Sequence, residues 1–261
     1  MSDNYSQTYS TSEKALEFHG YRTSSIHQAI IQQETWAILR VDEKASKGFF
    51  RNKSVLELGI GHGAISASLG TKIQNLSITG VDVSSSMLRM CKIDLSKDGP
   101  QRVDLNLVAG DIFHLPLRSL SSDSALIIRL IPNFRQNDLA LQEVARILKP
   151  DGQVIFDIYN RISVMALLDN VLNFLLGRQK KTYKHTCDLR HVVGTCESVG
   201  LTVKAHVGCL LLGEAFRFVP KQLLHIAMLA DRIVSNLPVF SKVSTRIFIL
   251  ASKTYRSLAC C

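Results

Sequence analysis

A cluster of glycines beside a carboxylate is the first feature of this sequence that could bind a ligand. The stretch Val55 to Ser66 reads VLELGIGHGAIS, so Gly59, Gly61 and Gly63 follow a short apolar run. Glycine is required where the backbone turns sharply or approaches a ligand closely, because a Cβ would collide. The helix predicted to start directly afterwards offers free N–H groups. Glu57 precedes the loop and favours a cationic ligand group over a pyrophosphate.

Two further carboxylates follow later apolar runs at positions that suit a nucleoside. Asp82, 23 residues after Gly59, ends the run ITGVD and suits a bidentate grip on ribose hydroxyls. Asp111, in VAGDI, could accept a hydrogen bond from an adenine amino group. The loop also fits the dinucleotide pattern G-x-G-x-x-A through Ala64. A nicotinamide oxidoreductase is therefore an alternative, which Glu57 and Asp111 disfavour.

Short apolar runs that alternate with helical segments must position these residues. The runs are bounded by Gly, Asp or Pro, as is typical of buried parallel strands. This alternation predicts a doubly wound α/β sheet. The expected strands are 54–58, 76–83, 103–108, 124–131, 153–158, 201–212 and 245–252, and the expected helices are 24–47, 87–95, 138–148, 161–177, 188–198 and 221–235.

With the stretch LKPDG at 148–152, these motifs resemble class I S-adenosylmethionine-dependent methyltransferases, above all their small-molecule, type 11-like branch. The resemblance covers residues 50–160 well and the last two strands more loosely. It implies a Rossmann-like, mostly parallel, seven-stranded sheet with its last strand antiparallel and a helical insertion after the fifth strand. We expect an N-terminal polar segment and helix over 1–47, and a methyltransferase domain over 48–261 with a helical cap at about 161–185.

The resemblance also implies S-adenosyl-L-methionine as cofactor and gives each matching residue a role. Gly59, Gly61 and Gly63 would lie under the methionine part, and Glu57 would orient its amino end or the loop. Asp82 would hold the ribose. The remaining cofactor contacts implied are Val83 and Met87 near the adenine or ribose, Asp111 and Ile112 at the adenine edge, and Arg129 near the methionine carboxylate or the substrate. No metal is expected.

Residues on the substrate side of such a fold are the candidates for catalysis. Methyl transfer is an in-line SN2 displacement, in which positioning and desolvation do most of the work. A general base is needed only where the nucleophile must lose a proton. The candidates are His185, His191, Tyr159 and Arg129, with a structural role as the alternative for each.

An apolar segment, 161–177, favours a small, apolar or lipid-like acceptor that is methylated at oxygen or carbon. One alternative is an RNA or protein methyltransferase, but Ile131 to Phe134 lack the motif expected for methylation of nucleic-acid bases, so a nucleic-acid partner is not expected. Another alternative is a non-catalytic, cofactor-binding subunit that activates a partner.

Composition and charge bound the remaining possibilities. The 261 residues have a mean hydropathy of +0.11 and a net charge of +9, and residues 151–261 hold 14 Lys and Arg against 7 Asp and Glu. Neither an apolar stretch of about 20 residues nor an apolar N-terminus is present, so we expect a soluble, cytoplasmic protein. Peripheral membrane contact through 161–184, which includes Arg178, Lys180, Lys181 and Lys184, is an alternative.

Overall fold

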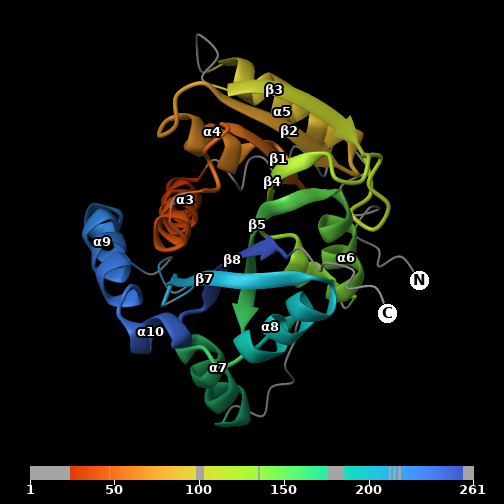
Figure 1. The fold of residues 1–261 in the computed structure, drawn as a ribbon. Helices are drawn as coiled ribbons and strands as arrows, with labels where there is room; N and C mark the ends of the chain where they lie inside the picture. The colour runs from red at the N-terminus through yellow and green to blue at the C-terminus, as the bar shows by residue number, and fades with distance from the viewer. Residues whose placement is uncertain are drawn as a thin grey trace, which may run out of the picture.

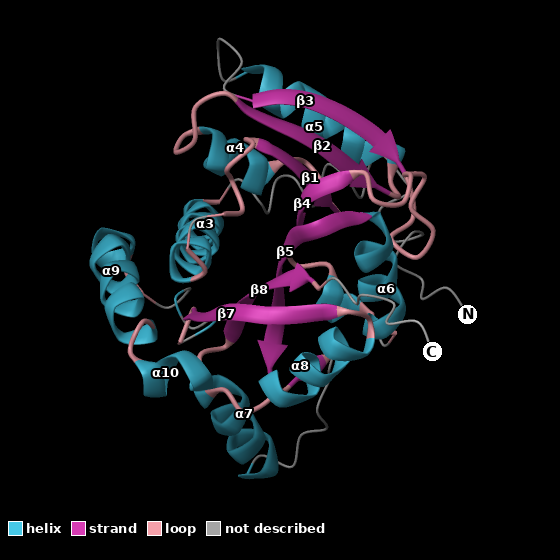
Figure 2. Cartoon of the chain, viewed as in Figure 1, coloured by secondary structure: helices cyan, strands magenta, loops and turns pink. Residues whose placement is uncertain are grey.

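The computed structural model describes residues 24–46, 48–97, 103–134, 136–175, 185–211, 213, 216 and 219–254 (Figures 1 and 2). Its strands are β1 (Ser54–Leu58), β2 (Leu76–Asp82), β3 (Val103–Ala109), β4 (Ser122–Ile127), β5 (Leu148–Asn160), β6 (Thr186–Cys187), β7 (Leu201–Cys209) and β8 (Arg246–Lys253). Its helices are α3 (Ser25–Lys44), α4 (Ala64–Gly70), α5 (Ser85–Lys97), α6 (Asn137–Ile147), α7 (Val164–Leu175), α8 (Leu189–Ser198), α9 (Leu224–Ser235) and α10 (Pro238–Val243), with short 3-10 turns at Ile131–Asn133 and Lys221–Leu223.

One sheet runs through the molecule in the order β3-β2-β1-β4-β5-β8-β7, and the two-residue β6 pairs with β5. Strand β8 is antiparallel to both β5 and β7, while the other pairs are parallel. The chain builds outward in one direction from β1 and in the other from β4. At such a reversal, the loops after neighbouring strands diverge and leave a crevice at the carboxyl ends of the strands.

Helices cover both faces of this sheet, which explains why its central strands are mostly apolar. Seven consecutive residues of β8, from Arg246 to Ser252, are buried. Successive strand residues point to opposite faces, so unbroken burial requires a cover on each side. Helices α3, α4, α5 and α9 contribute to the core on one face, and α6 and α8 to the core on the other (Figure 1).

The structure confirms the predicted doubly wound sheet and its antiparallel last strand. All seven predicted strands are present. The predicted helix 161–177 instead begins at Val164, because the Ser163 hydroxyl caps it by accepting from the backbone N–H of Ala166 at 3.1 Å. Two elements were not predicted, β6 and α10, since two and six residues are too short to show a period.

Helix α3 packs against β7, β8 and α4. Ser24 caps it, with its hydroxyl accepting from the His27 backbone N–H at 3.4 Å. Residues 1–23 and 176–184, which carry part of the predicted N-terminal segment and of the predicted membrane-contact segment, lie outside the described residues. None of the helices described is long and apolar enough to span a bilayer.

Candidate cofactor site

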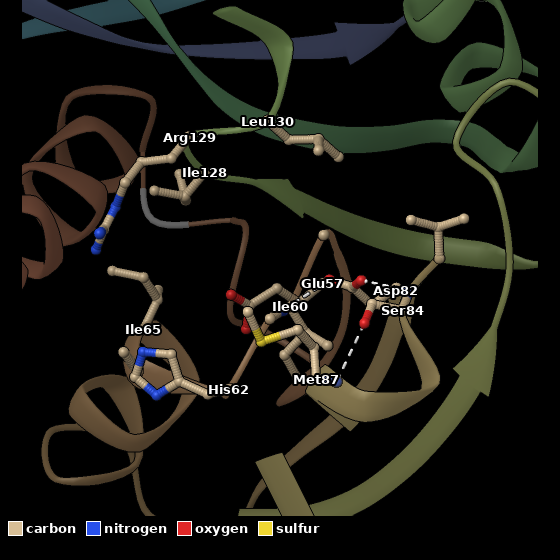
Figure 3. A pocket seen from close by; sticks show the side chains of 14 residues that line it. Glu57, Ile60, His62, Ile65, Asp82, Ser84, Met87, Ile128, Arg129 and Leu130 are labelled. Atoms are coloured by element: carbon tan, nitrogen blue, oxygen red, sulfur yellow. Dashed lines mark hydrogen bonds between the residues drawn. The ribbon is translucent and has the colours of Figure 1, made fainter. Parts of the chain in front are cut away.

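A pocket opens where the carboxyl ends of β1, β2 and β4 meet (Figure 3). This is the crevice created by the reversal of strand order between β1 and β4, the usual ligand position in open α/β sheets. The side chains and backbone that line it are those of Glu57, Gly59, Ile60, Gly61, His62, Ala64, Ile65, Asp82, Val83, Ser84, Met87, Ile128, Arg129 and Leu130.

The glycine loop forms one wall of the pocket. Gly59, Gly61 and Gly63 have φ angles of +72°, +56° and +82°, a region that side chains other than glycine rarely adopt. The Gly59 N–H donates to the Val81 carbonyl at 2.7 Å, and the Gly61 N–H donates to Oδ2 of Asp82 at 2.9 Å. The loop is therefore tied to the end of β2.

Two of these glycines serve different purposes. A Cβ added at Gly61 would meet no protein atom within 4 Å, so the space above it belongs to the pocket. A Cβ added at Gly63 would come within 2.7 Å of the Cys91 sulfur and 2.9 Å of Leu95. Gly63 thus allows close packing of the loop on α5 and is not among the lining residues.

Two carboxylates from neighbouring strands face this pocket. Asp82 accepts from the backbone N–H of Ser84 and from that of Gly61, both at 2.9 Å. Burial raises the pKa of Asp82, and these backbone donors offset part of that shift. Glu57 is only 3% exposed and accepts from the Ser66 hydroxyl. Burial raises the pKa of Glu57 to about 7, with the charge of Asp82 adding to the effect.

These shifted pKa values indicate what kind of ligand suits the site. Both carboxylates lose hydration, and the charge of Asp82 further disfavours ionisation of Glu57. A cationic ligand group would stabilise the ionised forms, whereas a pyrophosphate would repel them. The pocket therefore favours a ligand with positive charge near the start of the loop.

Arg129, the second residue after β4, lines the opposite side of the pocket, and its side chain extends toward α3 (Figure 3). Its backbone has a φ of +61°, and its N–H donates to Oδ1 of Asp157 at 2.6 Å. Its guanidinium donates to Oε2 of Glu34 at 2.5 Å and contacts Nε2 of His27 at 2.9 Å. Because arginine is only a donor, Nε2 of His27 accepts this bond.

A second arginine completes this buried network. Arg246 donates through Nε to Oδ2 of Asp157 at 2.9 Å and also pairs with Glu34. Burial alone would lower the pKa of Arg246, but the carboxylates of Asp157 and Glu34 raise it above its ordinary value. Two guanidinium groups and two carboxylates thus link α3, the end of β4, β5 and β8 beside the pocket.

The structure brings together seven of the ten residues predicted from the sequence to contact the cofactor. Gly63, Asp111 and Ile112 are not among the residues that line the pocket. The Asp111 side chain is exposed and accepts from the Phe113 backbone N–H at 3.0 Å, so it caps the turn after β3. Ile112 is buried in the core beside Leu115. Contact of Asp111 and Ile112 with an adenine stays a prediction, as does that of Gly63 with the methionine part. The seven that line the pocket are Glu57, Gly59, Gly61, Asp82, Val83, Met87 and Arg129.

Of the four catalytic candidates, Arg129 alone is among the residues that line the pocket. His191 is exposed at the first turn of α8 and borders a separate small cavity. The backbone N–H of His185 donates to the Pro132 carbonyl at 2.8 Å. The Arg246 guanidinium lies over the Tyr159 ring, with its Cζ 5.5 Å from the ring centroid. Catalytic roles for these residues stay predictions.

The network around Arg129 was not predicted, although the sequence carries a signal for it. Asp157 interrupts the apolar run VIFDIY, and Arg246 opens the apolar run RIFILA. Charged residues are rarely buried unless they are paired. A carboxylate and a guanidinium in two strands expected to be buried therefore indicate a buried ion pair, but they do not indicate that Glu34 and Arg129 join it.

The residues present fit S-adenosylmethionine. That molecule carries an ammonium and a sulfonium, a ribose diol and an apolar adenine face. The pocket offers one buried and one partly buried carboxylate, a loop with room for a ligand above Gly61, and apolar side chains at Ile60, Val83 and Met87.

Comparisons with known proteins agree with this fit. The family described as "Methyltransferase domain" matches residues 56–156. The ubiquinone/menaquinone biosynthesis C-methyltransferase of Syntrophotalea carbinolica is 32% identical over 120 residues, which are 46% of this chain and 48% of that protein. The fatty-acid O-methyltransferase of Mycolicibacterium smegmatis is 30% identical over 112 residues, which are 43% of this chain and 39% of that protein. The chain thus spans less than half the length of either relative.

A solved structure extends the likeness of fold to nearly the whole chain. The magnesium protoporphyrin IX methyltransferase of Synechocystis, with bound SAH, superposes with a TM-score of 0.60. The match covers 92% of this chain and 95% of that one, at 10% sequence identity. Residues 56–156 of this chain therefore match the methyltransferase-domain family, and the likeness to the solved structure shows that the fold extends well beyond them.

Proposed function

We propose that this protein transfers a methyl group from S-adenosylmethionine to a small, apolar or lipid-like acceptor, at oxygen or carbon. One observation carries the proposal. Two carboxylates, that of the buried Glu57 and that of the partly buried Asp82, face the same pocket as the open space above Gly61, at the point where the strand order reverses. This combination suits a ligand with both a cationic part and a diol.

The residues of the pocket divide the work of binding between them. Asp82 would hold the ribose hydroxyls, and Glu57 would face the cationic end of the methionine part. Arg129 would bind the methionine carboxylate. Its bond to Glu34 is compatible with this, because a guanidinium has five N–H donors. When bound, the cofactor supplies an electrophilic methyl group on a sulfonium, so the protein mainly has to align the acceptor and exclude water.

Two observations support an apolar acceptor. The relatives described above are named for a quinone pathway and for fatty acids. Helix α7, in the segment predicted to cap the domain, exposes large apolar side chains such as Phe174, which is 86% exposed. Both observations are compatible with an apolar or lipid-like acceptor.

Calorimetric titration of the full chain tests the cofactor site. We expect S-adenosylmethionine and S-adenosylhomocysteine to bind, and NAD not to bind. Asp82→Asn should raise the Kd for S-adenosylmethionine about 10- to 100-fold, because a hydrogen bond to a charged group contributes about 1.5–3 kcal/mol. Methyl transfer to quinone and fatty-acid acceptors is then measured with the same preparation.

Asp104→Asn is the matched control. Asp104 lies on β3 and accepts from the exposed Ser77 hydroxyl at 3.2 Å, away from the pocket. Its substitution should leave cofactor affinity unchanged. Binding of NAD alone, or equal affinities in the wild type and Asp82→Asn, would contradict the proposed cofactor site.

A further inference from the structure

Large apolar side chains are exposed mainly at one end of the molecule. Of the 17 such side chains among the described residues, 13 lie between 162 and 175 or between 223 and 240. These two ranges contain α7, α9 and the first half of α10. The 13 residues are Ile162, Leu167, Leu168, Val171, Phe174, Leu175, Leu223, Ile226, Leu229, Ile233, Leu237, Val239 and Phe240.

Helix α9 is apolar on two opposite sides. Leu224 and Met228 are buried on its inner side, against the core that includes α3. Ile226, Leu229 and Ile233, which are 63%, 51% and 63% exposed, follow one another at spacings of three and four residues. They form an outward stripe, and a helix that is apolar on both sides is normally covered on both.

Helix α7 presents a comparable stripe. Leu167, Val171, Phe174 and Leu175 share one side of this helix at 100° per residue, and each is more than half exposed. Asp169 lies on the opposite side. The apolar side of α7 therefore also points away from the protein core.

The three helices lie at the same end of the molecule. Helices α9 and α10 contact each other. The Asn160 side chain, just before α7, donates to the carbonyls of Lys242 and Ser244 at the end of α10, at 2.8 and 3.0 Å. Figure 1 shows α7, α9 and α10 along one edge, away from α5 and β3. We call the 13 exposed apolar residues, with these helices, the apolar end.

Basic residues accompany this apolar end. Lys221 and Lys242 are exposed beside α9 and within α10, and Arg232 is partly exposed on α9. Asp231 is buried, where it accepts from the backbone N–H groups of Leu210 and Leu211. Asp169 is the exposed carboxylate of the described part of these helices.

A cavity of about 340 Å³ opens between α3 and α9 at the same place. Its lining combines apolar Leu224, Met228 and Leu229 with basic Lys221 and Arg232, and the described residues that border it include no carboxylate. This is a chemically amphipathic lining, suited to an acyl chain beside a phosphate.

From these observations we infer that the apolar end docks on an anionic lipid surface. Exposed apolar stripes flanked by Lys and Arg are the features that bind such an interface, through burial of apolar area together with electrostatic attraction. A second copy of this chain is the less suitable partner, because it would bring the same basic residues and the net charge of +9 against each other. The inference does not depend on the cofactor site, although the exposed side chains of α7 also support the proposed apolar acceptor.

Flotation with vesicles tests the inference, using the full chain without cofactor or acceptor. We expect binding to vesicles of phosphatidylcholine mixed with phosphatidylglycerol, and much weaker binding to phosphatidylcholine alone. Ile226→Ser/Ile233→Ser should lower the vesicle partition coefficient about tenfold or more. Lys221→Glu/Lys242→Glu should lower it by a similar factor at low salt and by less at high salt.

Matched variants control for surface changes elsewhere. Ile93→Ser alters a side chain of α5 that is 54% exposed, and Lys72→Glu/Lys92→Glu reverses two exposed charges on that half of the molecule. These should retain wild-type binding. Asp82→Asn should also bind vesicles normally, which separates this inference from the cofactor site.

Three outcomes would overturn the inference. The first is equal binding of the wild type to neutral and anionic vesicles. The second is a loss of binding in the control variants as large as that in the variants of the apolar end. The third is no binding of the wild type at all. Sedimentation velocity without vesicles adds a fourth, because a dimer that Ile226→Ser/Ile233→Ser abolishes would assign the apolar end to a second copy. Circular dichroism of each variant establishes that it is folded.

Discussion

Among single residues, the buried Glu57 carboxylate couples folding to pH. Its pKa is about 7 in the folded protein and near 4.5 when unfolded, so between these values the folded state holds more protons. The stability from this group is therefore fully present below about pH 4.5 and lost as pH rises through 7. We expect a loss of about 3 kcal/mol in the free energy of unfolding over this range, and its absence in Glu57→Gln.

Urea unfolding at pH 5, 6, 7 and 8 measures this dependence. Asp104→Asn is again the control, since its pH profile should parallel that of the wild type. Asp82, whose pKa is also raised by burial, contributes with the same sign, so Glu57→Gln should reduce the slope without removing it. Parallel profiles for the wild type and Glu57→Gln would contradict the prediction.

The two glycines with different surroundings make a paired prediction. Gly63→Ala places a Cβ within 2.7 Å of the Cys91 sulfur at a φ of +82°, so we expect a loss of about 2–4 kcal/mol in unfolding free energy. Gly61→Ala meets no protein atom within 4 Å. It should cost only about 1 kcal/mol, from its positive φ, yet weaken S-adenosylmethionine binding by filling the pocket.

Thermal unfolding and calorimetric titration, run on both variants, distinguish the two effects. A comparable loss of stability in the two variants would show that the loop has no ligand-sized space at Gly61. Unchanged cofactor affinity in a folded Gly61→Ala would place the cofactor elsewhere.

At the scale of elements, the buried ion network decides how firmly α3 is held. Glu34 has a fully buried side chain and pairs with both Arg129 and Arg246. Removing one member of a buried charge pair leaves its partner uncompensated, at a cost of about 3–5 kcal/mol. We therefore expect Glu34→Gln to lower the free energy of urea-induced unfolding by about that amount.

Glu43→Gln on the same helix provides the comparison. Glu43 pairs with Arg40 at 2.9 Å, but both side chains are more than a third exposed. Surface pairs contribute about 0–1 kcal/mol. If Glu34→Gln and Glu43→Gln lowered stability equally, the network would not be what holds α3.

The strands and the buried ion network show how far the structure can be predicted from the sequence. The strands could be predicted because apolar runs such as 54–58 and 76–82 reflect burial on both faces, which is a local property. Asp82 ends such a run, and the structure has it among the residues that line the pocket. The partners of Glu34 lie 95 and 212 residues away along the chain, and no local pattern encodes a pairing at that separation. Asp111 shows a second limit. The end of β3 could be predicted from the sequence, but this does not determine whether the Asp111 side chain faces the pocket or caps its own turn.

At the scale of the whole molecule, charge and apolar exposure are unevenly distributed. The half that contains β1, β2 and β3 carries the pocket, while the exposed apolar residues lie mostly on α7, α9 and α10. The charge excess of residues 151–261 was evident from the sequence. The apolar end was not, because Ile226 and Ile233 have the period of an ordinary core helix and only the fold shows which side of α9 faces outward.

The bond between Glu34 and Arg246 joins the first described helix to the last described strand. During synthesis at about 5–20 residues per second, roughly 10 to 40 s separate the translation of these two residues. In that interval the residues that form β1 and β2 have already been translated, while Glu34 still lacks Arg246. The wall of the cofactor pocket at Arg129 can therefore take its final form only after nearly all of the described residues have been made.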